Sequence, residues 1–520
     1  MLASLFKKFT SDGFKRDENG SIIVFVMVVF SIMMMVGGAG VDLARYEFSR
    51  STLQYNLDRA VLAAASLKQQ EDPTTVVNDY MSWIVMNEEF EVTVTSSVQD
   101  YSRTVSASAV ANVDMWFLSM AGVSHLPAKV VSAAQEQKTN LEISLVLDVS
   151  GSMGSNNRLT NLKVAAKEFV DILLADIEED SVSISIVPFN SNTAPSQGLF
   201  DAINVAQTHT NTTCLDFTDA SFANAAVDPL VSQAQAEFTS YYGGFQSPHL
   251  PSSSCNDEGY FEIMPYANEA NVLHTKIDSL QAAGNTAGHV GIKWGLALLD
   301  PKFQSVVDDL IVGGDVDAGL TRLPAAYSDT ETRKIIVMMS DGANTTEFRI
   351  GDTYGTGPSP MMEVATGTAS FLHYLVSTDG SQYYSVADDV WISAAVFNAL
   401  STTLPTYLGT RQMDWPEAWG NMSTTYYNNV MNDAGPSNDF LGGTARNGAE
   451  ADPLMLNSCA AAATEGVTVY TIGFEMNPSS VDTLRDCASS VSHFYDANGT
   501  QISEVFGAIA TSILKLKLVN

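Results

Sequence analysis

Three oxygen-bearing side chains alternate in the segment Asp148-Val149-Ser150-Gly151-Ser152, which directly follows an apolar run at residues 143–147. A run of this kind is typical of a buried strand, so the three side chains come where that strand ends. Carboxylate and small hydroxyl groups provide the hard oxygen ligands that an ion such as Mg²⁺ prefers. The segment therefore indicates a divalent-cation site, although so short a motif also occurs in ordinary Ser/Gly turns.

Two later segments supply matching groups. In residues 283–291 a loop bracketed by glycines precedes an apolar helical pattern and places Thr286 near a helix N-terminus. In residues 334–342 a second buried-strand pattern ends in Asp341 and a glycine. Because open parallel sheets bind ligands outside the carboxyl ends of their strands, we expect three loops to meet at one sheet edge. The predicted site consists of Asp148, Ser150, Ser152, Thr286 and Asp341.

These residues resemble the von Willebrand factor A (vWA) domain and its metal-ion-dependent adhesion site (MIDAS), whose pattern is D-x-S-x-S, then a Thr, then an Asp. The resemblance implies that Ser150, Ser152 and Thr286 are hydroxyl ligands. It implies that Asp148 and Asp341 are carboxylates that bind the ion or orient its waters. The expected ion is Mg²⁺, with Mn²⁺ or Ca²⁺ as alternatives, and one coordination position is left for an acidic group of a protein partner.

Residues 139–520 predict a doubly wound α/β fold, which the resemblance identifies as a vWA (Rossmann-like) domain. Helical and strand patterns alternate, which favours βαβ crossovers and a parallel sheet. The expected helices are residues 159–174 and 481–488, the expected strands are residues 181–187, 467–474 and 493–495, and an apolar segment at residues 502–518 closes the domain.

Two long insertions interrupt this domain, at about residues 190–267 and 345–452. Both are rich in Ser, Thr, Asn, Gly, Tyr and acidic residues and show little sustained periodicity. Their aromatic residues favour satellite cores, with a binding surface as the alternative. These aromatics are Tyr241, Tyr242, Phe245, Trp391, Trp415, Trp419, Tyr426 and Tyr427.

The four cysteines form two local pairs along the chain. Cys214 and Cys255 lie in the first insertion, and Cys459 and Cys487 flank the strand expected at residues 467–474. An even number in a chain with a membrane signal favours two disulfides, Cys214–Cys255 and Cys459–Cys487, outside the reducing cytoplasm. The alternative is four buried free thiols. Zinc is not expected, because the sequence has no C-x-x-C and no His at ligand spacing.

Residues 21–41 contain no charged residue and are long enough to cross a bilayer core as a helix. A cleaved signal peptide is the alternative, but its apolar region would be shorter and would end at a small-residue cleavage site. We expect an uncleaved single-pass anchor in the bacterial inner membrane. Four Lys and Arg residues precede the span within residues 1–20, which weakly favours a cytoplasmic N-terminus and a periplasmic bulk of the chain.

The N-terminal segment resembles the TadE/TadG-like segment of Flp (tight adherence) pilus assembly proteins. The resemblance rests on the apolar helix after Gly20, on the run Gly37-Gly38-Ala39-Gly40-Val41-Asp42, and on residues 53–65. With a C-terminal vWA domain, the chain resembles a TadG-like protein. Pilin precursors carry Glu at the fifth residue after the cleaved Gly, whereas this chain has Phe25, which argues against prepilin processing.

Residues 42–138 are expected to continue the helix and then form a small β structure, a pilin-like stalk. Residues 90–95 and 104–110 alternate as half-exposed strands, and residues 129–134 are a third candidate. A stalk of this kind would pack beside similar chains. The alternative is a spacer without specific partners.

The formal net charge of −33 argues against a nucleic-acid partner. The sequence contains no arrangement typical of an enzyme, and we expect His289 to be an exposed residue at a helix start rather than a general base. The leading expectation is a membrane-anchored pilus assembly or adhesion protein that binds an acidic group of its partner through Mg²⁺. An envelope protein that senses surface contact and an accessory subunit of an enzyme complex are the alternatives.

Overall fold

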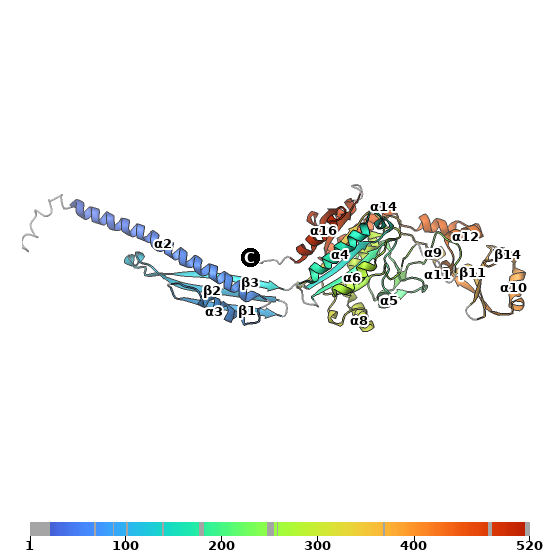
Figure 1. Ribbon diagram of the computed structural model, residues 1–520, viewed down its shortest axis with the longest axis horizontal. Coiled ribbons are helices and arrows are strands. Elements are labelled where there is room, and N and C mark those ends of the chain that lie inside the picture. Colours follow the sequence, from blue (N-terminus) through green and yellow to red (C-terminus); the bar gives the residue numbers. More distant parts are fainter. Residues whose placement is uncertain are drawn as a thin grey trace, which may run out of the picture. The chain divides into compact units, whose positions relative to one another are not determined.

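The computed structural model describes residues 21–514, apart from residues 67–68, 87, 100–101, 138–139, 176–180, 247–253, 257, 368–369 and 477–480 (Figure 1). The chain divides into two compact units, one containing residues 1–138 and the other residues 139–515.

The first unit is built on helix α2 (Ser21–Ala65), which is 45 residues long. Among the described residues, α2 is the one helix that is long and apolar enough to cross a membrane. Its C-terminal part packs with α3 (Pro73–Ser82) on an antiparallel sheet of β1 (Phe90–Gln99), β2 (Ser102–Asp114) and β3 (His125–Gln137). The core between them includes Leu53, Leu57, Val61, Val105, Ala109 and Val130. All three strands predicted for this region are present.

The second unit contains a six-stranded sheet in the order β17-β16-β10-β4-β5-β9. Its first five members pair in parallel, and the edge strand β9 (Met264–Ala267) pairs antiparallel with β5. The parallel strands are β4 (Asn140–Asp148), β5 (Val182–Phe189), β10 (Thr332–Ser340), β16 (Thr468–Phe474) and β17 (Phe494–Ala497). The central strand β4 is buried along its whole length, because helices cover both faces of the sheet.

Two hydrophobic cores flank this sheet, which confirms the predicted doubly wound α/β arrangement. One core packs against α4 (Arg158–Leu174), α6 (Ala270–Ser279) and α16 (Gln501–Leu514), of which α4 and α16 lie side by side (Figure 1). The other core packs against α7 (Gly288–Ala297), α8 (Gln304–Gly313), α14 (Gly448–Thr464) and α15 (Asp482–Cys487). Helix α7 lies close to the sheet because a Cβ on Gly295 would be 2.6 Å from a methyl group of Val146.

The first insertion follows β5 and holds short elements around a small sheet. These are α5 (Gln197–Asp201), β6 (Val205–Ala206), β7 (Leu215–Asp216), the 3₁₀ turn η3 (Asp219–Ala223) and β8 (Gln233–Gln235). The buried Lys293 on α7 fixes this insertion, since its ammonium donates to the carbonyls of Ser221, Asn224 and Ala226 at 2.7–2.9 Å.

The second insertion is more regular than its sequence pattern indicated. It contains a five-stranded sheet in the order β14-β13-β12-β11-β15, each pair antiparallel. The strands are β11 (Pro358–Thr366), β12 (Phe371–Val376), β13 (Gln382–Ser385), β14 (Val390–Ser393) and β15 (Tyr407–Asp414). The helices are α9 (Asp352–Gly355), α10 (Ala394–Thr403), α11 (Trp415–Asn421), α12 (Thr424–Met431) and α13 (Gly435–Asn438).

The aromatic residues of the two insertions form a satellite core, as expected. Trp415 and Trp419 are buried and stack with their ring centroids 4.9 Å apart. Tyr241 and Phe245 of the first insertion pack against the same core. Tyr242 differs, because 76% of it is exposed.

Two disulfides connect the cysteines in the predicted local pairs. Cys214–Cys255 lies within the first insertion, and Cys459–Cys487 joins α14 to α15.

Candidate functional site

The predicted metal site lies where the strand order of the six-stranded sheet reverses. From β4 the chain passes to β5 on one side and later to β10 on the other, so β4 lies between these two strands. Asp148 is the last residue of β4, and Asp341 directly follows β10. The carboxyl ends of the strands at such a switch point form the usual ligand crevice of an open α/β sheet.

A chain of hydrogen bonds joins the two carboxylates. Ser150 donates its backbone N–H to Asp148 Oδ1 at 2.8 Å, and its hydroxyl shares a 3.0 Å hydrogen bond with the hydroxyl of Ser152. Ser152 then donates to Asp341 Oδ1 at 2.7 Å. Ser340 donates its hydroxyl to Asp148 Oδ2 at 2.6 Å. Four of the five predicted residues are therefore in one connected cluster.

The loop that contains Thr286, the fifth predicted residue, is attached to the chain beside this cluster. Two backbone hydrogen bonds of 2.9 Å attach the loop to the residues after β4, one from Gly151 to Gly284 and one from Ala283 to Val149. Gly284 has φ +79°, and a Cβ there would lie 2.7 Å from Ser191 Oγ, so this position requires glycine. Among the described residues, no hydrogen bond joins the Thr286 side chain to the other four members of the site.

The site is acidic and mostly buried. Asp148 and Ser150 are at most 1% exposed, whereas Ser152 is exposed and forms the solvent-facing edge. Burial and the nearby Asp341 raise the pKa of Asp148 to about 6, although hydrogen bonds from Ser150 and Ser340 favour its charged form. Because the two carboxylates are close together and buried, a positive charge nearby would stabilise their ionised forms.

Arg158 supplies one positive charge at the edge of the site. Its Nη1 donates to Asp341 Oδ2 at 2.8 Å, and its Nε donates to Glu475 Oε2 at 2.9 Å. Sequence reasoning missed both Arg158 and Ser340. Ser340 is the last residue of β10, directly before Asp341, while Arg158 lies outside the D-x-S-x-S pattern and begins α4.

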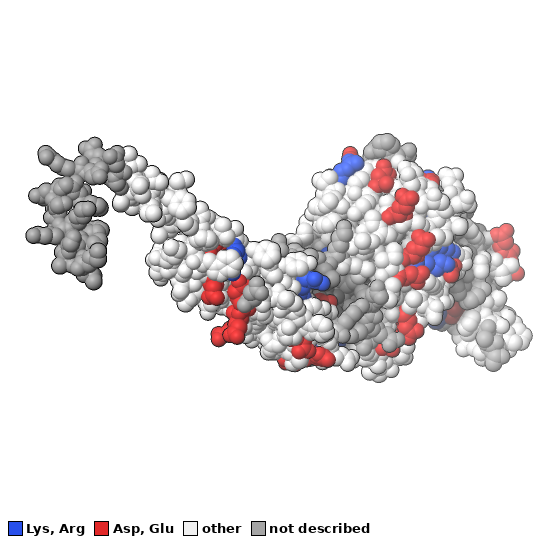
Figure 2. Space-filling model, turned by 60° about the vertical axis from the view of Figure 1, so that its left-hand side comes forward, with Lys and Arg blue, Asp and Glu red and all other residues white. Residues whose placement is uncertain are grey.

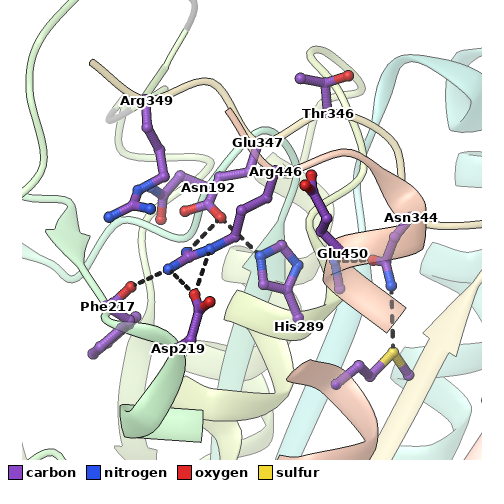
Figure 3. Close-up of polar contacts among 12 residues, drawn as sticks. Asn192, Phe217, Asp219, His289, Asn344, Thr346, Glu347, Arg349, Arg446 and Glu450 are labelled. Atoms are coloured by element: carbon purple, nitrogen blue, oxygen red, sulfur yellow. Dashed lines mark hydrogen bonds and ion pairs between the residues drawn. The ribbon is translucent and has the colours of Figure 1, made fainter. Parts of the chain in front are cut away.

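A buried ionic network links helix α7 to both insertions (Figure 3). His289 Nε2 and Arg446 Nη1 both contact Glu347 Oε2, at 2.8 and 2.9 Å. Arg446 also donates to Asp219 Oδ1 at 2.8 Å and to the carbonyl of Phe217 at 2.6 Å. Burial raises the pKa of Glu347, but the hydrogen bond and charge of His289 and the charge of Arg446 outweigh it and bring the pKa to about 2.

The expectation that His289 is exposed was wrong, because its side chain is fully buried and bonded to Glu347. The network supports the loop of Thr286. Glu347 is two residues after Thr345. The Thr345 hydroxyl accepts a hydrogen bond from the Thr286 N–H at 2.8 Å, and the Thr345 N–H donates to the Thr286 carbonyl at 2.9 Å. The start of the second insertion thus fixes the backbone of Thr286.

The donor set fits a hard divalent ion. Asp148 and Asp341 provide carboxylates, and Ser150 and Ser152 provide hydroxyls within hydrogen-bond distance of each other or of a carboxylate. Among the described residues, no group of three or more His, Cys, Asp or Glu side chains is placed to hold a metal ion, so a cation here would depend on the serine hydroxyls as well as on the two carboxylates. The chain as a whole is acidic, and Asp and Glu outnumber Lys and Arg on the face in Figure 2, in keeping with 59 acidic against 26 basic residues.

Comparisons with known proteins give one family match. Residues 20–67 match the family described as "Putative Flp pilus-assembly TadE/G-like". No curated protein matches the chain.

Several solved structures are similar to larger parts of the chain. The vWF domain of the type V pili tip protein Mfa5 from Porphyromonas gingivalis is 14% identical, with a TM-score of 0.34, over 74% of this chain and 99% of that chain. The pilus adhesin RrgA from Streptococcus pneumoniae is 12% identical, with a TM-score of 0.30, over 82% of this chain and 49% of that chain. Proximal thread matrix protein 1 from the mussel byssus is 10% identical, with a TM-score of 0.27, over 72% and 46%. Since all three TM-scores are below 0.5, these similarities do not establish a shared fold over the matched length.

Proposed function

We propose that this chain is a membrane-anchored pilus assembly or adhesion protein that binds a protein partner through a divalent cation. The observation that carries the proposal is the hydrogen-bonded cluster of Asp148, Ser150, Ser152 and Asp341 at the switch point of a parallel sheet. We assign this sheet to a vWA-type domain and the cluster, with Thr286, to its MIDAS. A Mg²⁺ ion held there would offer an electrophilic coordination position to a carboxylate of the partner.

The anchoring part of the proposal is supported by the N-terminal unit. Helix α2 is long and apolar enough to cross a membrane, and residues 20–67 match a pilus-assembly family. Two disulfides fit an oxidising compartment, which supports the proposal that the second unit is on the extracytoplasmic side of the bacterial inner membrane, with the N-terminus inside. Pilus-assembly components are the proposed partners.

We infer a binding role rather than a catalytic one. A metal-assisted hydrolase needs a base near the activated water. His289 is the histidine nearest to Thr286 in the sequence. Its Nε2 is hydrogen-bonded to Glu347, and its side chain is buried inside the protein rather than exposed at the site edge formed by Ser152. The groups that remain around the cluster are hydroxyls, carboxylates and the Arg158 guanidinium, which suit recognition of an acidic group.

Crosslinking in cells that assemble pili tests this proposal. Full-length wild type, Asp148→Ala and Asp300→Ala are compared with and without EDTA. Asp300 is a matched control, because it is also buried and accepts hydrogen bonds from Lys302 and Tyr327 but lies beyond the far end of α7 from Thr286. Wild type and Asp300→Ala should capture pilus components in Mg²⁺, and EDTA or Asp148→Ala should abolish capture. Equal capture by Asp148→Ala, with no effect of EDTA, would contradict the proposal.

A further inference from the structure

The loop between β2 and β3 presents an uncharged, apolar surface to solvent. Residues 115–124 read MWFLSMAGVS and contain no ionisable side chain. Trp116 is 62% exposed, Met120 is 74% exposed and Val123 is 39% exposed. Apolar side chains gathered in one loop of an otherwise acidic protein indicate a surface that another apolar phase covers.

This loop is attached to helix α2 at the end of its apolar span. Asp42, the first charged residue after residues 21–41, accepts the backbone N–H groups of Trp116, Phe117 and Leu118 at 2.8–3.0 Å. The ring of Phe117 lies against Gly38, where any Cβ would overlap it. Because Gly38 belongs to the apolar span, the loop reaches the level at which α2 would enter the bilayer.

The loop also leaves few backbone groups that need water. Besides the three N–H groups bonded to Asp42, those of Met115, Met120, Gly122 and Val123 donate to carbonyls within the loop or at its ends, at 2.8–3.1 Å. Ser119 donates its hydroxyl to the Trp116 carbonyl at 2.7 Å. Non-helical backbone is tolerated near the hydrocarbon when its polar groups are satisfied internally, and seven of the ten backbone N–H groups of this loop meet that condition through these hydrogen bonds.

Polar groups border the loop on the side away from the apolar span. The guanidinium of Arg45 lies 3.8 Å from the centre of the Trp116 ring and donates to the Asp114 carbonyl at 3.2 Å. An exposed Trp between an apolar helix and a cation has the amphipathic surroundings typical of aromatic residues at a membrane interface.

We propose that residues 115–124 insert into the interface of the same bilayer that α2 spans and form a second membrane contact. The occupant of this surface is lipid at the boundary of headgroups and acyl chains. The contact holds the three-stranded sheet at a fixed height on the membrane, since Asp42 and Gly38 tie the loop to the helix. This inference rests on the proposed anchoring of α2.

Single-cysteine labelling of the full chain in phosphatidylcholine vesicles tests the inference. The four native cysteines are all in disulfides, so an introduced cysteine is the one reactive thiol. Met120→Cys is labelled with an environment-sensitive fluorophore, and quenching by lipids brominated on their acyl chains is measured. Met120 is exposed, so the substitution leaves the core intact.

Two further label sites make the result interpretable. Ser31→Cys lies within the apolar span and reports whether α2 inserts. Val98→Cys is on β1, where Val98 is 55% exposed against 74% for Met120. Val98 pairs with Arg103, which donates to the Ser66 carbonyl just past the end of α2. From residue 42 to residue 66 a helix rises by about 36 Å, which places Val98 far from the bilayer.

We expect bromolipids to quench the labels at positions 31 and 120 and to leave the label at position 98 several-fold less quenched. Quenching at position 31 with none at position 120 would overturn the loop inference while leaving the anchor intact. Loss of quenching at position 31 would overturn both. A label at position 120 that becomes shielded only in cell membranes, and not in vesicles of pure lipid, would assign the surface to a protein and also overturn the inference.

Discussion

Arg158 donates a 2.8 Å hydrogen bond to Asp341, so a guanidinium lies at the flank of the proposed cation site. The Asp341 side chain is fully buried, while that of Arg158 is 17% exposed and also contacts Glu475. The positive charge that these carboxylates need is thus partly supplied by the protein itself. A bound Mg²⁺ would therefore lie beside the Arg158 guanidinium and compete with it for the negative charge of the Asp341 carboxylate.

Removing this charge should strengthen cation binding. We expect Arg158→Gln to lower the dissociation constant for Mg²⁺ by about three- to tenfold, because one repulsive charge near a partly screened site contributes on the order of 1 kcal/mol. Titration calorimetry of the full chain measures the change. Lys167→Gln is the control, since Lys167 is on the same helix but pairs with Asp278. Unchanged or weaker binding by Arg158→Gln would show that the arginine positions Asp341 rather than competing with the ion.

Thr286 is the least connected member of the site, and an isosteric variant tests its role. Thr286→Val keeps the shape and removes the hydroxyl, while the backbone hydrogen bonds to Thr345 remain. If the hydroxyl is a ligand, Mg²⁺ affinity should fall by at least about tenfold. Thr275→Val, an exposed change on α6, should have no effect. If Thr286→Val binds Mg²⁺ with wild-type affinity, the Thr286 hydroxyl is not a ligand.

The network at Glu347 predicts a stability that depends on pH. The pKa of this carboxyl is lowered from 4.5 to about 2, so its contribution is present above pH 4.5 and is lost as the pH falls towards 2. A shift of this size corresponds to roughly 3 kcal/mol. Chemical denaturation should find Glu347→Gln less stable than wild type at pH 7, with a difference that narrows between pH 4.5 and pH 2.

The exposed Glu450→Gln, at the start of α14, controls for general effects of acid. A difference between wild type and Glu347→Gln that stays constant with pH would contradict the network's electrostatic role.

The two disulfides predict the mass of the non-reduced chain and a contribution to its free energy of unfolding. Mass spectrometry of the non-reduced chain should find two bridges, Cys214–Cys255 and Cys459–Cys487. The second closes a loop with a sequence separation of 28, so Cys459→Ala with Cys487→Ala should lower the free energy of unfolding by about 3 kcal/mol. Four free thiols would overturn both the pairing and the extracytoplasmic placement.

The main sheet was predictable because its strands carry a strong local signal. Residues 143–147 are a mostly apolar run followed directly by Asp148, and residues 335–339 are an apolar run followed by Ser340 and Asp341. The helices beside them show regular apolar spacing, as in α4, whose buried residues Leu162, Ala165, Ala166 and Phe169 share one face. These signals locate Asp148 and Asp341 at one sheet edge.

The partners of the site were not predictable, because they come from distant parts of the chain. Glu347 contacts the buried His289, and Arg446 pairs with Glu347. The sequence near Thr286 does not indicate either contact. The strands of the second insertion were not predictable either. Strands β13 and β14 have four residues each, and β11 has an irregular burial pattern and two register shifts, so its residues show no regular alternation of buried and exposed positions.

Direct measurement of Mg²⁺ binding tests most simply whether the Asp148 cluster is a cation site. Calorimetric titration of the full chain in detergent, after treatment with EDTA, compares wild type with Asp148→Asn and the control Asp300→Asn. We expect one saturable Mg²⁺ site in wild type and in Asp300→Asn, and none in Asp148→Asn, with all three proteins folded. Absence of saturable binding in wild type, or equal binding by Asp148→Asn, would contradict it.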